Sequence, residues 1–187
     1  LVGRITIDDI IDVIKEEADK DYQLAAGISQ DVEADDSILE LTKARLPWLV
    51  LALLGGFGTV KILGTFEGAM MDHGELFFFT PLIAAMAGNV GVQSSAIIVQ
   101  GLANDTLSGS LFKRLIKEVS LSLFNGFILA VILFIGSYLL LGLSVIMGVI
   151  VTIALVSVIV IASLIGTFVP LLLDKFGFDP ALATGPF

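Results

Sequence analysis

Long apolar stretches in the last three quarters of the sequence predict that most of this chain lies in a membrane. The first two run over about 47–66 and 76–103, and each is long enough to cross a hydrocarbon core of roughly 30 Å. Residues 119–173 contain no Asp, Glu, Lys or Arg. One helix over that stretch would be about 80 Å long, so the chain must fold back. The turn is expected at Leu141-Gly142-Leu143-Ser144, between spans at about 117–141 and 145–173.

A further span is expected to begin near the end of the sequence. Pro180 suits the first turn of a helix, and Asp179 suits its N-cap. A helix starting at 180 would continue past Phe187, so the chain is expected to be part of a longer protein. The predicted fold class is all-α: a polytopic helical membrane protein with four visible transmembrane helices and the start of a fifth.

The amino-terminal quarter of the chain is polar and acidic and predicts an amphipathic connecting helix. Residues 2–7 alternate apolar and polar side chains, as an edge strand does. The helix is expected to begin near Asp9, with Thr6 or Asp8 as its cap, and Gly27 ends the pattern.

The same change of pattern divides the chain into domains. A polar acidic linker is expected at 28–36, followed by a short helix on the membrane surface at 37–46. The predicted units are the end of a soluble module at 1–7, the connecting helix and linker at 8–46, and the transmembrane domain at 47–187.

Composition and charge agree with this division. Apolar residues make up 56% of the 187 residues, the mean hydropathy is +0.99, and the formal net charge is −9. Phosphate binding needs clustered Lys and Arg, so nucleic acid is excluded as a partner, whereas cations are attracted. The chain has no cysteine, which excludes disulfides and thiolate metal sites.

Basic side chains set the predicted orientation in the membrane. They precede the first span, separate the second from the third, and follow the fourth: Lys43, Arg45, Lys113, Arg114, Lys117 and Lys175. The loops at 67–75 and 141–144 carry none. The amino terminus is therefore expected in the cytoplasm, with a multi-pass domain in the cell (inner or plasma) membrane and the lipid bilayer as a partner.

The second span is interrupted at its middle by small and polar residues, from Gly88 to Ser95. One interpretation is helix packing, since Gly and Ser allow close approach and Gln bonds across an interface. The other is the wall of an ion pathway, because amide oxygens and backbone carbonyls bind a hydrated cation without a permanent buried charge. The residues predicted to line that pathway are Gly88, Asn89, Gly91, Gln93 and Ser94.

Carboxylates outside the spans each have two interpretations. Asp179 could cap a helix or bind a cation, and Glu67 at the outer mouth could concentrate cations or simply be solvated. Six carboxylates lie close together on the connecting helix: Asp9, Asp12, Glu16, Glu17, Asp19 and Asp21. They form either a solvated face or a site where a divalent cation relieves their mutual repulsion. The one histidine, His73, is interpreted as structural or neutral.

The sequence does not predict an enzyme. It contains no nucleophile–base pair, no phosphate-binding glycine loop and no metalloprotease spacing. Without a Walker motif, ATP-driven transport by this chain is not expected either.

With these motifs in place, the chain resembles the membrane domain and connecting helix of the MgtE magnesium channels, which are related to the magnesium-type solute carriers of animals. The most specific motif is the run from Pro81 to Ser95. The supporting runs are Gly3 to Ile14, Gly64 to Glu67, and Gly177 to Ala183.

The resemblance implies a homodimer with five spans per subunit, in which spans two and five of both subunits line one pore for Mg²⁺. It also implies CBS modules that sense cytoplasmic Mg²⁺, the second ending at residues 1–7, and a plug helix over about 8–27. By motif matching, the candidate ligands of regulatory Mg²⁺ are Asp9, Asp12, Glu17 and Asp21. Asp179 is a further candidate metal ligand, where the plug helix meets the pore domain, and Asn89 falls in the pore motif.

The sequence departs from the family pattern at several positions. Val92 stands where relatives often have a second Asn, so one pore amide is absent. Lys15 and Lys20 replace acids that are common in the plug helix. The family's main pore aspartate is expected beyond Phe187. The ion is therefore left open among Mg²⁺, Mn²⁺, Co²⁺ and Ca²⁺.

Three functions are compatible with the sequence. The first is a divalent cation channel that conducts Mg²⁺ down its electrochemical gradient and is gated by cytoplasmic Mg²⁺. The second is a secondary carrier coupled to Na⁺ or H⁺, and the third is a non-transporting membrane scaffold. A carrier would need titratable residues or repeats within the membrane, and spans two to four are expected to lack titratable residues.

Overall fold

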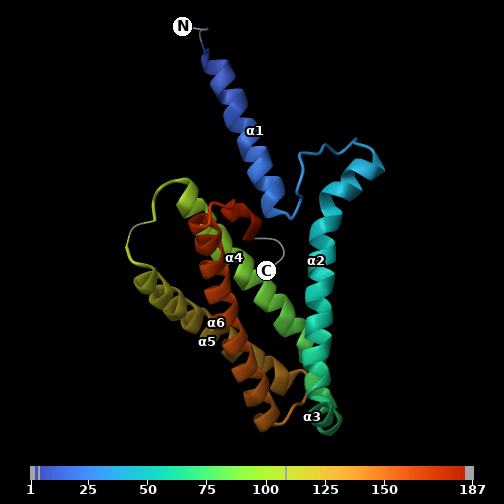
Figure 1. The fold of residues 1–187 in the computed structure, drawn as a ribbon. Coiled ribbons are helices and arrows are strands. Elements are labelled where there is room, and N and C mark those ends of the chain that lie inside the picture. Colours follow the sequence, from blue (N-terminus) through green and yellow to red (C-terminus); the bar gives the residue numbers. More distant parts are fainter. Residues whose placement is uncertain (1–2, 4, 108, 184–187) are drawn as a thin grey trace.

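The computed structural model describes residues 3, 5–107 and 109–183, and this part of the chain is largely helical (Figure 1). The long helices are α1 (Ile7–Ala25), α2 (Ile38–Gly64), α4 (Thr80–Ala103), α5 (Leu111–Leu139) and α6 (Val145–Lys175). The short helices are α3 (Glu67–Asp72), η1 (Gly74–Phe79) and η2 (Pro180–Ala183).

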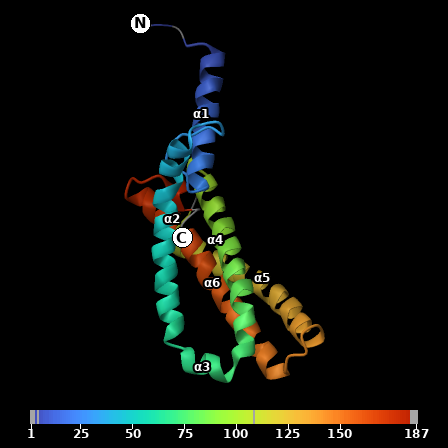
Figure 2. The same ribbon diagram turned by 90° about the vertical axis from the view of Figure 1, so that its right-hand side faces the viewer.

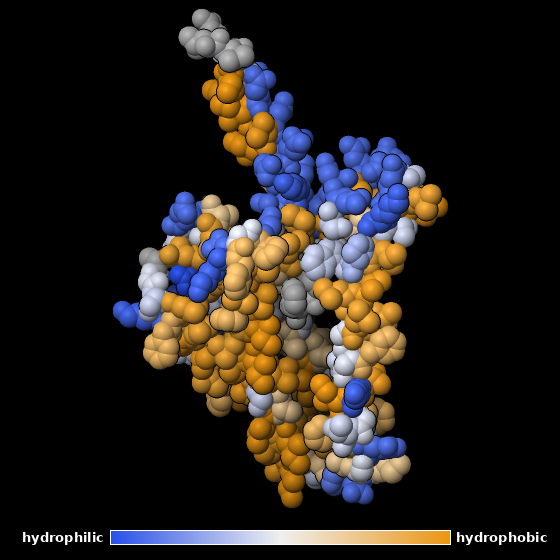
Figure 3. All heavy atoms as spheres, viewed as in Figure 1, coloured by the Kyte–Doolittle hydropathy of each residue, from blue (hydrophilic) through white to orange (hydrophobic). Residues whose placement is uncertain are grey.

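The predicted all-α membrane fold is confirmed. In the described part of the chain, four helical segments are long and apolar enough to cross a membrane: α2, η1 with α4, α5 and α6. The short 3-10 helix η2 begins at Pro180, where the fifth span was expected to start, and residues 184–187 lie outside the described residues. Figure 3 shows the result as a broad apolar surface over the bundle, with polar residues gathered on α1 and the linker at one end.

Helix α6 is the centre of the bundle, because α4 and α5 both pack against it (Figure 2). Its buried residues recur every three or four positions, which places them on one side of the helix: Gly148, Val151, Leu155, Ile159, Ser163, Gly166, Thr167 and Pro170. Helices α4 and α6 approach each other closely at Gly91 and Gly166. A Cβ atom on Gly166 would lie 2.4 Å from the Gly91 carbonyl oxygen.

The surface helix expected at 37–46 is not separate from the first span. Both belong to α2, a helix of 27 residues that contains Pro47. Proline lacks an N–H and disturbs the preceding turn, and α2 bends in its first third (Figure 1). Within α2 only Ala44 is buried. Its carbonyl oxygen accepts hydrogen bonds of 3.0 Å from both the backbone N–H and the hydroxyl of Ser29, which tie the linker to α2.

The fold-back between the third and fourth spans is confirmed at the expected turn. Ser144 caps α6 by accepting a hydrogen bond from the Met147 N–H, and Gly142 has a φ of 65°. That left-handed conformation strains residues with a Cβ, so glycine suits it. Helix α5 starts at Leu111, six residues before the expected 117, since Ser110 caps it there.

The amino-terminal stretch contains no strand among its described residues. Gly3, Ile5 and Thr6 have no regular structure, and Leu1, Val2 and Arg4 lie outside the described residues. Thr6, one of the two expected caps, is the N-cap of α1. The helix begins at Ile7, two residues before the expected start at Asp9. Gly27 ends this region with a φ of 76°, in agreement with the sequence pattern.

Candidate functional site

The polar stretch of the second span does not break its helix. Residues 88–95 lie inside α4, which is continuous from Thr80 to Ala103. The interruption is therefore one of composition: the helix continues, but its surface carries small and polar side chains in place of large apolar ones. At 3.6 residues per turn, Gly88, Gly91 and Val92 share one side of α4, whereas Asn89, Gln93 and Ser94 share the other.

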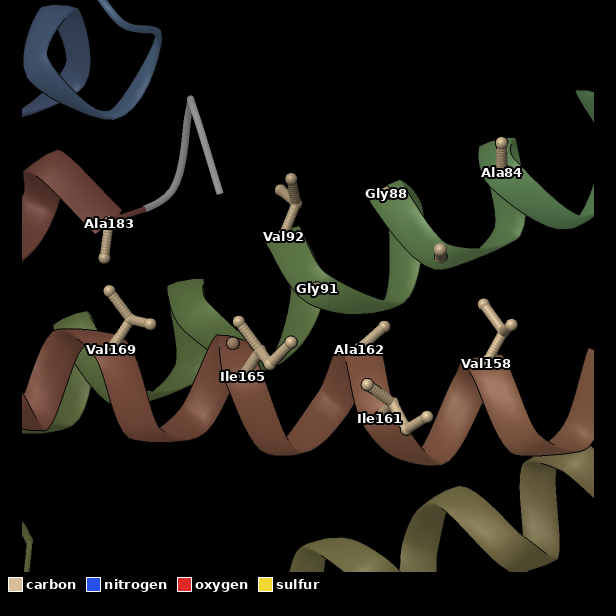
Figure 4. Close-up of a pocket in the computed structure, with 12 residues that line it drawn as sticks. Ala84, Gly88, Gly91, Val92, Val158, Ile161, Ala162, Ile165, Val169 and Ala183 are labelled. Atoms are coloured by element: carbon tan, nitrogen blue, oxygen red, sulfur yellow. The ribbon is translucent and has the colours of Figure 1, made fainter. Parts of the chain in front are cut away.

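The glycine side of α4 borders an apolar cavity of about 450 Å³ between α4 and α6 (Figure 4). Its lining side chains are all Ala, Val or Ile apart from the glycines, and Ala183 of η2 lies at one end. Val92 also lines this cavity and offers it no polar side-chain group. Only backbone carbonyls offer polar groups here, each with a lone pair beyond its helical hydrogen bond.

The amide side of α4 borders a second cavity, of about 390 Å³, between α4 and α5 with α6 at its floor. Asn89, Gln93 and Ser94 contribute from α4. The Ser94 hydroxyl, which is 6% exposed, donates a 2.6 Å hydrogen bond to the carboxylate of Glu118 on α5. The five predicted pathway residues are thus divided between two cavities on opposite sides of one helix.

Glu118 is a functional candidate that the sequence reasoning missed. The expectation that spans two to four lack titratable residues is wrong, because α5 carries Glu118 toward the bundle interior. Ser122 and Asn125 line the same cavity and follow it at i+4 and i+7, on one helix face. This spacing was the available signal. Ser122 also bonds the Ser163 hydroxyl of α6, which fixes the α5 face against the floor helix.

The carboxylates of α1 are exposed and do not converge. Asp9 and Asp12 form one pair and Glu17 and Asp21 another, with a rise of about 7–8 Å along the helix between the pairs. No group of three or more His, Asp or Glu side chains suited to a metal occurs among the described residues. A regulatory ion at either pair would need ligands from another element.

Asp9 also has a local structural role. Its carboxylate accepts hydrogen bonds from the Thr6 hydroxyl at 2.6 Å and the Thr6 N–H at 2.8 Å. These bonds, the hydroxyl one first, lower the pKa of Asp9. Glu17 lies 3.9 Å from the Lys20 ammonium, an exposed pair of the kind that contributes little.

Asp179 caps the segment that meets α1. Its carboxylate accepts a 2.8 Å hydrogen bond from the Ala181 N–H, as the cap interpretation requires. The helix that follows, η2, packs against both α1 and α6, and Ala181 and Ala183 are buried. Asp179 itself is exposed, so its cap role leaves it accessible.

Helix α3, which begins at Glu67 and is followed by His73, lies at the other end of the molecule from α1 (Figure 1). Glu67 begins the short helix α3 and is exposed, and His73 follows that helix and is exposed too. Neither residue lines either of the two cavities, so the structure brings them into neither site.

These features define the class of the protein: a multi-pass helical membrane protein with small and polar residues on the inward faces of its spans. Comparison with known proteins gives the family. The model of MgtE, described as a divalent cation transporter, matches residues 80–187. The chain belongs to this family.

Full-length relatives agree with the family match. The whole chain is 37% identical to the magnesium transporter MgtE of Bacillus subtilis, 37% to that of Enterococcus faecalis and 33% to that of Thermus thermophilus. It spans 41%, 41% and 42% of the lengths of these relatives, respectively.

Proposed function

We propose that this chain is the membrane part of a Mg²⁺ transport protein, in which hydrated Mg²⁺ passes along α4 down its electrochemical gradient. The observation that carries the proposal is the stretch Gly88 to Ser95, which opens cavities on α4 inside an otherwise apolar bundle. The family and the names of its relatives support Mg²⁺ as the cargo. A potential of about 100 mV supplies roughly 4.6 kcal/mol for two charges, so no other energy source is required.

The glycine side of α4 is the better candidate for the wall of the pathway. Gly88 has no side chain to cover the helix backbone on this side, and Mg²⁺ keeps several of its waters when it binds. A wide neutral wall therefore suits contacts made through water. The cavity also reaches Ala183, from which the expected fifth span and a second subunit would complete the enclosure.

Regulation by cytoplasmic Mg²⁺ would act through η2. This element packs against α1, and its residue Ala183 lines the cavity between α4 and α6. Movement of α1, as a plug helix that binds Mg²⁺ together with sensor modules, would thereby alter the end of the pathway. Replacing Asp12 and Asp21 together by Asn should weaken the inhibition of flux by Mg²⁺ on the amino-terminal side. Unchanged inhibition would contradict this part of the proposal.

The pathway is tested by flux in liposomes that contain the full-length protein and a Mg²⁺-sensitive dye. Uptake should appear when a K⁺ gradient with valinomycin makes the interior negative. Gly88→Val should lower the rate of uptake by about an order of magnitude or more, since an added barrier of ~1.4 kcal/mol already slows a rate tenfold. A Cβ on Gly88 has no neighbour within 4 Å, so the variant should fold.

Gly136→Val is the matched control, because a Cβ there also has no neighbour within 4 Å and Gly136 lies on α5, away from this cavity. Its flux should equal that of the wild type. Absence of Mg²⁺ flux in the wild type under an inward potential would reject the channel. Equal flux in Gly88→Val and Gly136→Val would reject the assigned wall.

A secondary carrier coupled to Na⁺ or H⁺ is a second candidate, and Glu118 is the observation that favours it. A carboxylate on an inward helix face is the kind of group that carriers use for coupling. This function requires that Mg²⁺ uptake depend on an opposing Na⁺ or H⁺ gradient at zero potential. Uptake driven by the potential alone, with both gradients absent, would exclude it.

A further inference from the structure

The cleft between α4 and α5 is lined with oxygen-bearing side chains that the proposed pathway does not use. Both helices pack on α6, and the space between them has Ile159 as its floor. The polar side chains come from both walls: Asn89, Gln93 and Ser94 from α4, and Glu118, Ser122 and Asn125 from α5.

Glu118 supplies the only negative charge in this cleft. Its carboxylate accepts a 2.6 Å hydrogen bond from the Ser94 hydroxyl. A carboxylate on an inward face of a span is costly unless a proton or a cation neutralises it.

We propose that this cleft binds a hydrated divalent cation, with the Glu118 carboxylate as its charged ligand and the amides of Asn89, Gln93 and Asn125 as water-mediated or direct oxygen contacts. The proposal rests on the proposed function for the identity of the cation, Mg²⁺. It assigns these residues to a site distinct from the wall formed by Gly88 and Gly91.

The donor set and the volume favour such an ion. Every polar group of the cleft offers oxygen, the ligand that Mg²⁺ prefers, and one or two carboxylates with retained waters are its usual protein site. Six waters occupy about 180 Å³ at roughly 30 Å³ each, and the cleft measures about 390 Å³. A hydrated ion therefore fits without displacing side chains.

The separation of the two sites follows from the geometry of α4. Asn89 and Gln93 point to the side of the helix opposite Gly88 and Gly91, and each set lines its own cavity. An ion beside Glu118 thus lies off the path along the α4–α6 cavity. From there it can stabilise the arrangement of α4 and α5, by bridging two helices that otherwise meet mainly through α6.

The test uses the full-length protein in lipid nanodiscs with millimolar Mn²⁺ as the probe, and locates Mn²⁺ by anomalous scattering after crystallisation in lipid. The expected result is a peak in the cleft about 4–5 Å from the Glu118 carboxylate for a water-mediated contact, or about 2.1 Å for a direct one. Glu118→Gln should abolish this peak and leave peaks elsewhere in the protein. Ser120→Ala, on an exposed part of α5, should keep it.

Two further arms make the result decisive. If Glu118→Gln does not fold, Asn125→Ala keeps the Ser94–Glu118 bond and should weaken Mn²⁺ occupancy of the cleft. Infrared difference spectra of wild type against Glu118→Gln report a protonated carboxyl group. A protonated Glu118, or an empty cleft while other sites fill with Mn²⁺, would overturn the proposal. Since the readout is occupancy, flux without cleft Mn²⁺ rejects only this inference, and cleft Mn²⁺ without flux rejects only the proposed function.

Discussion

At the scale of single residues, two glycines set how closely α4 and α6 approach. A Cβ atom on Gly166 would lie only 2.4 Å from the carbonyl oxygen of Gly91. This oxygen belongs to the backbone of α4, so it cannot rotate away as a side chain could. In a membrane, where lipid tails are as apolar as side chains, such close packing is a main source of helix association. The sequence shows both glycines but does not pair them.

This pairing gives the first stability prediction. Gly166→Ala forces α4 and α6 apart and should destabilise the protein by about 1–3 kcal/mol, the usual cost of overpacking. Thermal unfolding of the purified protein in detergent measures the effect. Gly136→Ala, with no neighbour within 4 Å of the new Cβ, is the control and should be neutral or slightly stabilising. Equal melting of both variants would show that the contact does not limit the helix distance.

At the scale of elements, the helices begin where their capping residues place them. Thr6, Ser37, Ser110 and Ser144 cap α1, α2, α5 and α6 with side-chain oxygens. These signals are local, so they could be found in the sequence, as the Thr6 cap was. The extension of α2 through Pro47 was missed, because a proline inside a helix looks like a boundary.

The cap of α1 predicts a pH dependence of that helix. The Thr6 bonds lower the pKa of Asp9, so their stabilisation is present above the unfolded pKa of about 4 and is lost as the pH falls through the lower folded pKa. The amino-terminal turn of α1 should fray in that acidic range. Thr6→Val, which removes the hydroxyl, should raise the pKa of Asp9 toward its ordinary value.

Carbon-13 NMR titration of the aspartate and glutamate carboxyl groups in the protein measures this shift. Glu40 serves as the internal control, because Ser37 lowers its pKa through the same kind of capping box on α2. Its titration should be unchanged in Thr6→Val. An Asp9 pKa that is identical in wild type and variant would refute the role of Thr6.

At the scale of the whole molecule, α2 packs closely against no other helix in the described part of the chain. None of its most apolar 18 residues is buried, although its length suits a membrane span. Gly55, Gly56 and Gly58 lie along it, and a Cβ on any of them would have no neighbour within 4 Å. Lipid alone or a second subunit can cover this helix, and the homodimer expected from the sequence resemblance would supply the second subunit.

A homodimer in contact through α2 predicts disulfide cross-linking. The chain has no cysteine, so Gly55→Cys creates a single thiol per subunit. Oxidation of membranes that contain the full-length protein should then give a covalent dimer on a non-reducing gel. Gly136→Cys on α5 is the control and should remain monomeric. A monomeric mass by light scattering in detergent, together with no cross-link, would argue against the dimer.

The amino-acid sequence by itself determined the four spans, the turn at Gly142 and the position of the polar stretch in α4, and it narrowed the cap of α1 to Thr6 or Asp8. These features depend on composition, span length and local hydrogen bonds, which need no knowledge of neighbours. Only the tertiary structure decided which side of α4 faces α6, which side faces α5, and that Glu118 meets Ser94. A span that is apolar all round carries little periodicity to orient it, so its rotation is set by packing against other helices.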